Sequence, residues 1–525
     1  DWSSDVCSSD LMTALLADIP LEPVGIPRGR AMVERAQWAA LSFATYDIES
    51  VRRIAHAAAA AGEQMAAELG EAAVQETGYG VAEHKKLKNV ACSIGIWNTY
   101  GDMDFVTPVV RADQGIVDVP RPAGVVLALT PSTNPVATVF FKIMLALLTR
   151  NAIIISPHPF AKRVCTDAAR AMAEAAVAAG APDGCIQVVE EPSIPLINAL
   201  MTDERVDVIV ATGGAAMVRA AYRSGNPAIG VGPGNVPVVV DATADLTAAA
   251  RRIVASKAFD NSILCTNESV LIVEERAADA LSAALRREGA HILDADEVER
   301  VRAVIFTGPN FNTNWVGKSA QEIAQAADVK VPASTRILVA PFPIVVPEEM
   351  FAHEKLCPVL GMVTAPSAAR AIDAAKAVLR ISGAGHSAAI HSEDPAMIMS
   401  FASAVPVLRV AVNVGNSLGS AGIETNLAPT MTIGTGFFGR SAVGENLEPK
   451  HLVNMTRIAY GTDVPMPEFG ALDPWQAPTG AVPPYPIASN MEGAPELVRP
   501  DQPEDELREE IRRLVIEEQI GRAHV

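Results

Sequence analysis

A repeated alternation of short, wholly apolar segments with helical segments constrains the fold of this chain more than any other feature. From about residue 121, apolar segments alternate with helices predicted over 136–149 and 161–179. The apolar segments are AGVVLALTP, NAIIIS, CIQVVE and VDVIVATGG. Such alternation is typical of a parallel sheet that is covered by helices on both faces.

A second alternation of the same kind begins at NVPVVVD. It continues through helices predicted over 245–257 and 276–287 and through the apolar strands ESVLIVEE and TRILVA. Two successive blocks predict an α/β chain with two doubly wound domains rather than one. Ligands bind at the carboxyl ends of the strands in such folds, so we expect the active site in the loops that follow the strands.

The composition excludes several classes of function. The 525 residues include 42 basic and 61 acidic ones, and a net charge of −19 argues against a nucleic-acid partner. The most apolar stretch contains Lys142 and is too short to cross a bilayer, and the N-terminus lacks a signal-peptide pattern. We therefore expect a cytoplasmic protein with no membrane partner. The six cysteines include no CxxC pair, which argues against a disulfide framework or a zinc site.

One cysteine stands out by its context. Cys265 lies in the segment AFDNSILCTNESVLIV, in a polar turn just before a predicted strand. A thiol on such a turn is accessible to a substrate, whereas Cys165 falls inside a predicted helix. A lone cysteine in a chain of this length is more often structural than catalytic, so its role depends on the motifs around it.

A set of short motifs accompanies this cysteine in a fixed order. With them, the chain resembles the aldehyde dehydrogenase superfamily, in particular its CoA-acylating branch of the acetaldehyde and propionaldehyde dehydrogenase type, over about residues 30–460. The motifs are TPSTNP (130–135), SPHP (156–159), ATGG (211–214), SGNPAIGVGPGNVP (224–237), FDNSILC (259–265), EKLCPVL (354–360), GAGHSAAIH (383–391), PTMTIGTGFFGRS (429–441) and HLVN (451–454).

The resemblance implies the aldehyde dehydrogenase fold, with two Rossmann-like domains. It places an NAD-binding domain at 12–234 and a catalytic domain with the cysteine at 235–430, after which 431–461 returns to the cofactor and oligomerisation region. The hairpin-like segment 111–120, with Gln-Gly at its turn, matches the oligomerisation strands of the family. A homodimer or a dimer of dimers is therefore expected, with an ordinary surface hairpin as the alternative.

The resemblance also implies a mechanism. Cys265 would be the nucleophile, and Asn134 together with the backbone N–H of Cys265 would stabilise the oxyanion. Hydride would then leave for NAD, and CoA would resolve the thioester on Cys265. Hydrolytic relatives carry a glutamate some thirty-odd residues before the nucleophile, where this chain has Val231, which cannot activate water. Glu268, three residues after Cys265, is expected to be a solvated or ion-paired strand residue.

The expected activity is thus the reversible oxidation of a short-chain aldehyde with NAD+ and CoA to an acyl-CoA and NADH. A hydrolytic aldehyde dehydrogenase that gives a carboxylate and a catalytically silent scaffold of the same fold are the alternatives. Only about 65 residues follow the matching region, so no downstream iron-dependent alcohol dehydrogenase half is expected.

Several loops are candidates for cofactor contacts. The GxGxxG-like run at 434–439 lacks a clear βαβ unit, so it does not predict a dinucleotide site. Backbone amides of the ATGG segment, before a helix predicted over 215–223, could face a diphosphate. By resemblance, SPHP contacts the adenosine ribose and EKLCPV the nicotinamide ribose. The predicted cofactor-binding residues are Ser156, Pro157, His158, Thr212, Gly213, Gly214, Gly232 and Glu354.

Two histidines close together in the sequence are candidate metal ligands. His386 and His391 lie in GHSAAIH, which is predicted as a strand, and the sequence offers no third ligand beside them. We therefore predict no metal site.

The two ends differ from the rest of the sequence. Residues 1–11 and the final GRAHV show no pattern and are expected to be artefacts, with Met12 as a natural start. The proline-rich segment 462–500 is predicted to be a linker, and 501–520 an amphipathic helix. This helix resembles the encapsulation peptides of short-chain acylating dehydrogenases, which implies a shell-protein partner and a location inside a bacterial microcompartment. A helix that folds back on its own oligomer is the alternative.

Overall fold

The computed structural model describes residues 25–470, 472 and 474–477. The segments 1–11 and 501–520 and part of the proline-rich segment 462–500 lie outside the described residues. No helix within the described part of the chain is long and apolar enough to span a membrane.

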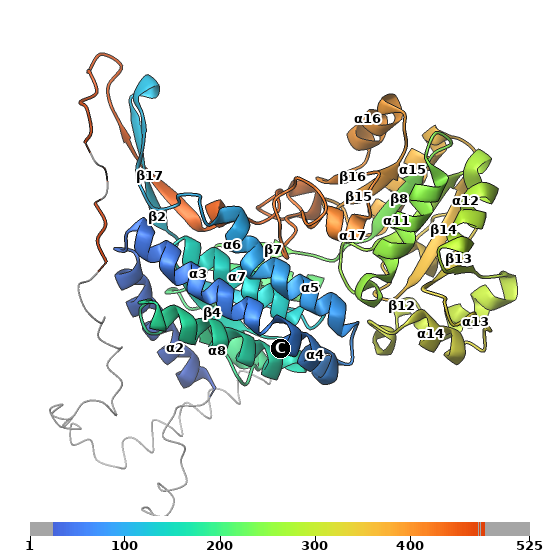
Figure 1. Cartoon of the computed structure of the whole chain (residues 1–525), viewed down its shortest axis with the longest axis horizontal. Coiled ribbons are helices and arrows are strands. Elements are labelled where there is room, and N and C mark those ends of the chain that lie inside the picture. The colour runs from blue at the N-terminus through green and yellow to red at the C-terminus, as the bar shows by residue number, and fades with distance from the viewer. Residues whose placement is uncertain (1–24, 471, 473, 478–525) are drawn as a thin grey trace, which may run out of the picture. The chain divides into compact units, whose positions relative to one another are not determined.

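The first sheet is parallel, with the order β5-β4-β3-β6-β7. Figure 1 labels its strands β4 and β7 among the helices of the first domain. Its strands are β3 (Val125–Leu129), β4 (Ala152–Ser156), β5 (Ile186–Val188), β6 (Val208–Thr212) and β7 (Ala228–Val231). Every residue of β3 and β4 is buried, as expected for strands between two layers of helices. Helix α7 (Pro135–Leu148) connects these two strands and is itself buried along its whole length.

Helices that precede this sheet or connect its strands cover it. Helix α3 begins at Asp47, whose carboxylate accepts a hydrogen bond from the backbone of Ser50 (2.7 Å), and it packs against α7 and α8. Helix α5 packs against α4 and α7. It also contacts the short segment Phe259–Ser262 of the second domain. The bounds are α2 (Ile26–Phe43), α3 (Ile48–Gln64), α4 (Ala66–Thr77), α5 (Ala82–Cys92), α6 (Ile94–Tyr100), α8 (Lys162–Ala178), α9 (Ile194–Met201) and α10 (Ala215–Arg223).

The second sheet is also parallel, with the order β10-β13-β14-β9-β8-β15-β16. Strand β8, which lies between β9 and β15, shows why the strand sequence is apolar at every position. Val238 and Val240 belong to one hydrophobic cluster and Val239 to another, so both faces of the strand are buried. The strands are β8 (Val236–Val240), β9 (Glu268–Glu274), β10 (Ala290–Ile292), β13 (Ile337–Pro341), β14 (Val359–Ala365), β15 (Ala388–His391) and β16 (Val410–Val412).

Helices on both faces complete the second domain, and a short antiparallel ribbon lies between α13 and α14. The helices are α11 (Leu246–Ala258), α12 (Glu275–Arg287), α13 (Ala295–Ile305), α14 (Ala320–Ala326), α15 (Ala368–Ile381), α16 (Pro395–Ala404) and α17 (Asn416–Gly419). The ribbon consists of β11 (Phe306–Thr307) and β12 (Asn310–Phe311). Two parallel sheets with helical cover confirm the predicted α/β fold.

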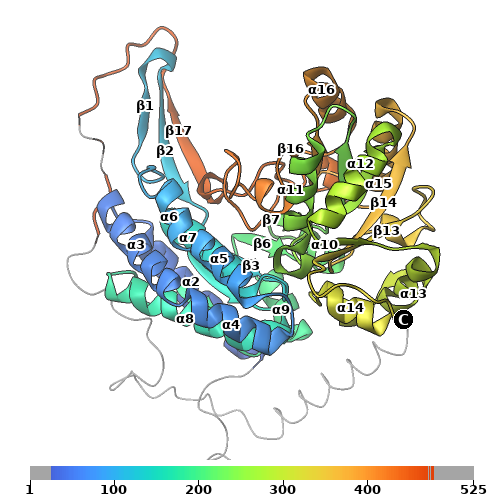
Figure 2. The same cartoon turned by 45° about the vertical axis from the view of Figure 1, so that its right-hand side comes forward.

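A third, antiparallel sheet joins segments that lie far apart in the sequence. Strands β1 (Val109–Arg111) and β2 (Ile116–Pro122) form a hairpin, and β17 (Val453–Ala459) pairs with β2 (Figure 2). Gly115 closes the hairpin with a φ of 64°. Buried Asp118 accepts hydrogen bonds from Arg111 on β1 (2.9 Å) and Arg457 on β17 (3.0 Å), so one carboxylate ties all three strands together.

A substitution of Gly124 tests whether the backbone before β3 of the first sheet requires a glycine. It precedes β3 with a φ of +127°, and a Cβ there would lie 2.1 Å from the Asp207 carboxylate, which accepts a hydrogen bond from the backbone of Val125. We expect Gly124→Ala to lower the free energy of unfolding by about 2–4 kcal/mol, because an L side chain is strained at this φ and Asp207 has to move.

Urea denaturation followed by circular dichroism measures this effect. Gly213→Ala is the matched control, because no atom lies within 4 Å of a Cβ at that position. Equal unfolding midpoints for the two variants would contradict the prediction.

Candidate active site

All ten residues predicted for the site line one cavity of about 380 Å³. They come from both parallel sheets. The residues are Asn134, Ser156, Pro157, His158, Thr212, Gly213, Gly214, Gly232, Cys265 and Glu354. The residues of the first sheet end or follow its strands, as expected for a parallel sheet. Cys265 and Glu354 instead precede β9 and β14, so the second sheet contributes them from the amino ends of its strands, which differs from the expectation that the site lies only in loops that follow strands.

The first sheet contributes the loops that follow β3, β4 and β6. Asn134 is the N-cap of α7, Ser156 ends β4, and Thr212 ends β6 just before Gly213 and Gly214 lead into α10. A Cβ on either of these glycines would meet no atom within 4 Å, so the backbone at the start of α10 is open to a ligand. The Ser156 hydroxyl is buried and has no hydrogen-bond partner among the described residues.

His158 follows Ser156 at the rim of the cavity. The side chain is exposed, and its Nδ1 accepts a hydrogen bond from the backbone of Phe160 (3.2 Å). The imidazole also packs edge-on against the Phe160 ring, with 5.1 Å between the ring centroids. These contacts hold the loop after β4 in place.

The second domain contributes Cys265 from a turn between the short 3-10 segment η3 (Phe259–Ser262) and β9. Burial raises the pKa of the Cys265 thiol to about 12, with a further contribution from the negative charge of Glu354 and an opposing one from Arg409. The thiol is therefore protonated at neutral pH in this structure. The other cysteines that the structure describes are buried, whereas Cys265 reaches the cavity.

Glu354 is the only carboxylate among the described residues that line the cavity. Its Oε1 accepts a hydrogen bond from the backbone of Gly234 (3.2 Å). Burial raises its pKa to about 8, and the charges of Lys257 and Lys355 oppose that rise. This side chain therefore changes its protonation state near neutral pH.

Val231 also lines the cavity, so the position 34 residues before Cys265 carries no proton acceptor. The prediction for Glu268, in contrast, was wrong. Glu268 is fully buried rather than solvated, and it accepts hydrogen bonds from the Ser256 hydroxyl (2.7 Å) and the backbone of Asn416 (2.8 Å). Burial raises its pKa, and both of these hydrogen-bond donors are uncharged. It therefore serves to join α11 to α17.

The two histidines of the GHSAAIH segment are buried. His391 ends β15 and His386 precedes the strand, with its Nδ1 at 3.0 Å from the Ser387 hydroxyl. Burial lowers the pKa of His386 to about 3 and that of His391 to about 4. Among the described residues, no group of three or more His, Cys, Asp or Glu side chains could hold a metal ion.

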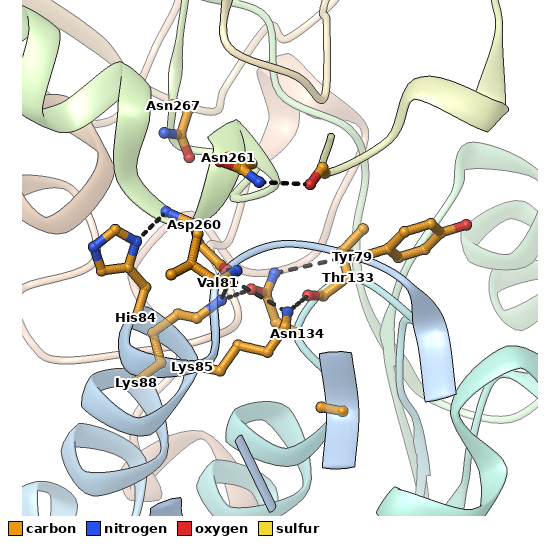
Figure 3. A network of polar contacts seen from close by, with 12 residues as sticks. Tyr79, Val81, His84, Lys85, Lys88, Thr133, Asn134, Asp260, Asn261 and Asn267 are labelled. Atoms are coloured by element: carbon orange, nitrogen blue, oxygen red, sulfur yellow. Dashed lines mark hydrogen bonds and ion pairs between the residues drawn. The ribbon is translucent and has the colours of Figure 1, made fainter. Parts of the chain in front are cut away.

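A buried polar cluster contacts Asn134, and the sequence did not indicate it. Lys85 and Lys88, on one face of α5, both contact the carboxylate of Asp260 in η3, and Lys88 also donates a hydrogen bond to the Asn134 side-chain oxygen (Figure 3). The three ionisable side chains are each at most 3% exposed. The spacing of two lysines by three residues places them on one helix face, but nothing in the sequence indicates that this face is buried.

Comparisons with known proteins agree on one family. The sequence profile of the aldehyde dehydrogenase family matches residues 28–448. The bifunctional aldehyde-alcohol dehydrogenase of Escherichia coli is 38% identical over 435 residues, which are 82% of this chain and 49% of that protein. The succinate-semialdehyde dehydrogenase (acetylating) of Clostridium kluyveri is 36% identical over 433 residues, 82% of this chain and 95% of that protein. The chain thus spans about half the length of the bifunctional relatives.

Solved structures show the same likeness. An acetylating aldehyde dehydrogenase from Geobacillus thermoglucosidasius is similar with a TM-score of 0.82 and 36% identity, over 85% of this chain and 98% of that one. A Rhodopseudomonas palustris propionaldehyde dehydrogenase with bound CoA and an acylated cysteine has a TM-score of 0.74 and 29% identity, over 82% and 97%. A propionaldehyde dehydrogenase from the fucose utilisation bacterial microcompartment of Clostridium phytofermentans has a TM-score of 0.74 and 26% identity, over 82% and 97%.

The raised pKa of Cys265 predicts how its reactivity depends on pH. Iodoacetamide should alkylate Cys265 about three- to sevenfold faster for each pH unit from 7 to 9, because only the thiolate reacts, the pKa of about 12 lies above this range, and the ionisation of Glu354 offsets part of the tenfold rise per unit. Mass spectrometry of the Cys265 peptide measures the rate, with Cys265→Ser as the control for labelling of other thiols. A rate that does not change with pH would contradict the pKa.

Glu354→Gln tests the cause of that shift. At pH 9 the wild-type Glu354 carboxylate is mostly ionised, because its pKa is about 8, and its negative charge raises the pKa of the thiol. Removal of this charge lowers the thiol pKa, so the variant should be alkylated about two- to tenfold faster at pH 9. The difference should shrink at pH 7, where Glu354 is mostly protonated.

Proposed function

The chain belongs to the aldehyde dehydrogenase family, and we propose that it oxidises a short-chain aldehyde with NAD+ and CoA to an acyl-CoA and NADH. The observation that carries the proposal is one cavity in which Cys265 and Asn134 meet, with Val231 at the position of the general base of hydrolytic relatives. Relatives named acetylating or acylating support an acyl-CoA product.

Cys265 is proposed as the nucleophile. It lines the cavity from a turn, so its sulfur is accessible to an aldehyde carbon, and attack by the thiolate gives a thiohemiacetal. The acylated cysteine of the Rhodopseudomonas palustris enzyme supports this role. The four remaining cysteines of the described residues are buried and do not line this cavity, so a substrate bound there does not reach them.

Asn134 is proposed to stabilise the oxyanion of the thiohemiacetal. Its side-chain oxygen accepts a hydrogen bond from Lys88, and one N–H of its amide is directed to the Thr133 hydroxyl (3.3 Å). The other N–H remains for the substrate oxygen, and the backbone N–H of Cys265 is the second proposed donor. Loss of one such donor typically costs a hundred- to a thousandfold in turnover.

The loops of the first sheet fit a nicotinamide dinucleotide. The open backbone of Gly213 and Gly214 at the N-terminus of α10 suits a diphosphate, and the unpartnered Ser156 hydroxyl suits a ribose. Glu354 also lines the cavity, near enough to Cys265 for its charge to raise the thiol pKa, and it is proposed to hold the nicotinamide ribose. When bound, NAD supplies the hydride acceptor.

The proposed fate of the thioester follows from the side chains around it. Val231 is apolar and nearly fully buried, so it neither takes up a proton nor holds a water molecule. An incoming thiol then has the advantage over water, and the bound CoA of the Rhodopseudomonas palustris structure supports CoA as that thiol.

Hydrolysis is the second candidate, because one observation favours it. Glu354 lines the same cavity, and its pKa of about 8 suits a general base near neutral pH. If Glu354 activates water, the product is a carboxylate and CoA is not required.

The three-stranded sheet is proposed to form the contact between subunits of a homodimer or a dimer of dimers. It exposes several large apolar side chains, which a second copy of the chain would cover. These are Val109, Val110, Met455 and Ile458.

A shell protein of a bacterial microcompartment is proposed as a further partner. The segment 501–520 has an amphipathic pattern with apolar positions at Leu507, Ile511 and Leu514. A structural relative comes from a fucose utilisation bacterial microcompartment, which supports this proposal. Such a helix would dock in a groove of the shell through its apolar face.

CoA dependence tests the proposed reaction. Without CoA, propionaldehyde and NAD+ should give a single burst of about one equivalent of NADH per active site, because Val231 cannot activate water for the next turnover. CoA should restore steady turnover, and Cys265→Ser should abolish both phases. The absorbance of NADH measures them. Steady NADH formation without CoA, accompanied by release of propionate, would instead establish hydrolysis.

A reporter fusion tests the proposed shell partner. Residues 496–520, fused to a fluorescent protein, should concentrate in puncta in cells that produce a cognate shell, and a fusion with Ile511→Asp and Leu514→Asp should remain diffuse because its apolar face is lost. Fluorescence microscopy measures the distribution. If the wild-type segment stays diffuse and its deletion changes the oligomeric state of the enzyme, the segment folds back on its own oligomer.

A further inference from the structure

Asn134 has an unusual role for an asparagine at the start of a helix. An N-cap asparagine normally accepts a hydrogen bond from the backbone of the first helical turn with its side-chain oxygen. Asn134 caps α7 without any such bond. Its side-chain oxygen instead accepts a hydrogen bond from the ammonium group of Lys88, on a different helix (Figure 3).

This bond determines which end of the amide faces the cavity. An amide presents an oxygen acceptor on one side and an NH2 donor on the other, and an ammonium group can only donate. Lys88 therefore holds the oxygen of Asn134 on its own side and leaves the NH2 group free to face away from α5. The proposed oxyanion donor is correctly oriented only in this arrangement.

The same ammonium group contacts the segment that carries the nucleophile. Lys88 forms a buried ion pair with Asp260, which lies five residues before Cys265 in the sequence. Burial disfavours the charge of Asp260, but Lys88 and Lys85 outweigh it and hold the pKa of this carboxyl below its usual value. Lys88 thus connects the amide of the first domain to the nucleophile turn of the second.

Asp260 is itself held from several directions. Its carboxylate accepts a hydrogen bond from the backbone of Val81 (2.7 Å), and its own backbone N–H donates to Nδ1 of His84 (2.8 Å). The His84 ring stacks on Phe259, with centroids 4.6 Å apart. Asp260, Asn261 and Ser262 all have positive φ values, of 49°, 50° and 62°. Non-glycine residues adopt this conformation only where surrounding contacts enforce it.

We propose that Lys88 is a positioning residue that orients the Asn134 amide toward the oxyanion and anchors it to Asp260, so that the donor and the nucleophile keep a fixed relative geometry. The proposal rests on the proposed function, in which Asn134 is the oxyanion donor. A cation on the amide oxygen also polarises the amide and strengthens its N–H groups as donors.

Lys85 is a natural control. It lies on the same face of α5, is equally buried, and contacts the same carboxylate at 3.3 Å. Its second contact, however, is the backbone carbonyl of Thr133 (3.3 Å) and not the Asn134 amide. The two lysines therefore share the ion pair but differ in their contact with the amide.

The test compares Lys88→Met with Lys85→Met in the full-length enzyme, with propionaldehyde, NAD+ and CoA. Lys88→Met should lower kcat about a hundredfold, as for loss of an oxyanion donor, and Lys85→Met less than about tenfold. NAD+ affinity and the alkylation rate of Cys265 should stay within about threefold of wild type in Lys88→Met, because neither depends on the amide. A changed alkylation rate would mean that Lys88 acts on the nucleophile turn instead.

A double-mutant cycle shows whether Lys88 acts through Asn134. The variant Lys88→Met with Asn134→Ala should be no slower than Asn134→Ala alone, within about twofold, because the second change removes the group that the first misplaces. Multiplied losses would overturn the proposal and leave the proposed function intact. If Asn134→Ala alone has wild-type kcat, the oxyanion assignment fails first.

A second variant shows whether misfolding accounts for a loss of activity in Lys88→Met. Lys88→Met leaves Asp260 with one partner, and an incompletely paired buried charge is destabilising. Lys88→Met combined with Lys85→Met and Asp260→Asn removes all three buried charges of the cluster and keeps the side-chain volumes similar. A folded form of this variant, judged by its melting temperature, should show the same hundredfold loss in kcat. Wild-type kcat in it would overturn the proposal.

Discussion

The close approach of Gly234 to Cys265 is the constraint on which the site depends. Gly234 lies in the short connection from β7 to β8, where the chain passes from the first parallel sheet to the second. A Cβ at this position would lie 2.0 Å from the carbonyl oxygen of Cys265, so only a glycine fits. The same residue donates its backbone N–H to Glu354. Gly234 therefore brings the turn with Cys265 and the carboxylate of Glu354 together at the cavity.

The fold could be predicted from the sequence because both sheets are buried on both faces. Strands such as β8 and β4 are then apolar at every position, and this pattern is visible without any knowledge of the fold. Ser156 and Thr212 end strands of the first sheet, so the same pattern predicted that their loops share one edge. Cys265 instead precedes β9, at the amino end of a strand of the second sheet, so its place in the same cavity was predicted from the resemblance to the family and not from the strand pattern.

The buried charges could not be predicted, because each depends on a partner far away in the sequence. Lys88 and Asp260 are separated by 172 residues, and in the sequence Lys88 resembles the solvated lysines of any amphipathic helix. The burial of Glu268 could not be predicted either, because a glutamate at the start of a strand is usually solvated. Its partners Ser256 and Asn416 come from α11 and α17, and only the tertiary structure brings them to it. Patterns in the sequence indicate which face of an element is apolar, but not which polar groups are enclosed.

The high pKa of the Cys265 thiol also bears on how long the protein stays intact. Peroxides attack thiolates and convert them first to sulfenic acid and then irreversibly to sulfinic and sulfonic acids, whereas protonated thiols react slowly. Burial keeps Cys265 protonated in this structure. The environment that raises this pKa would thus also slow the oxidation of Cys265, the residue proposed as the nucleophile.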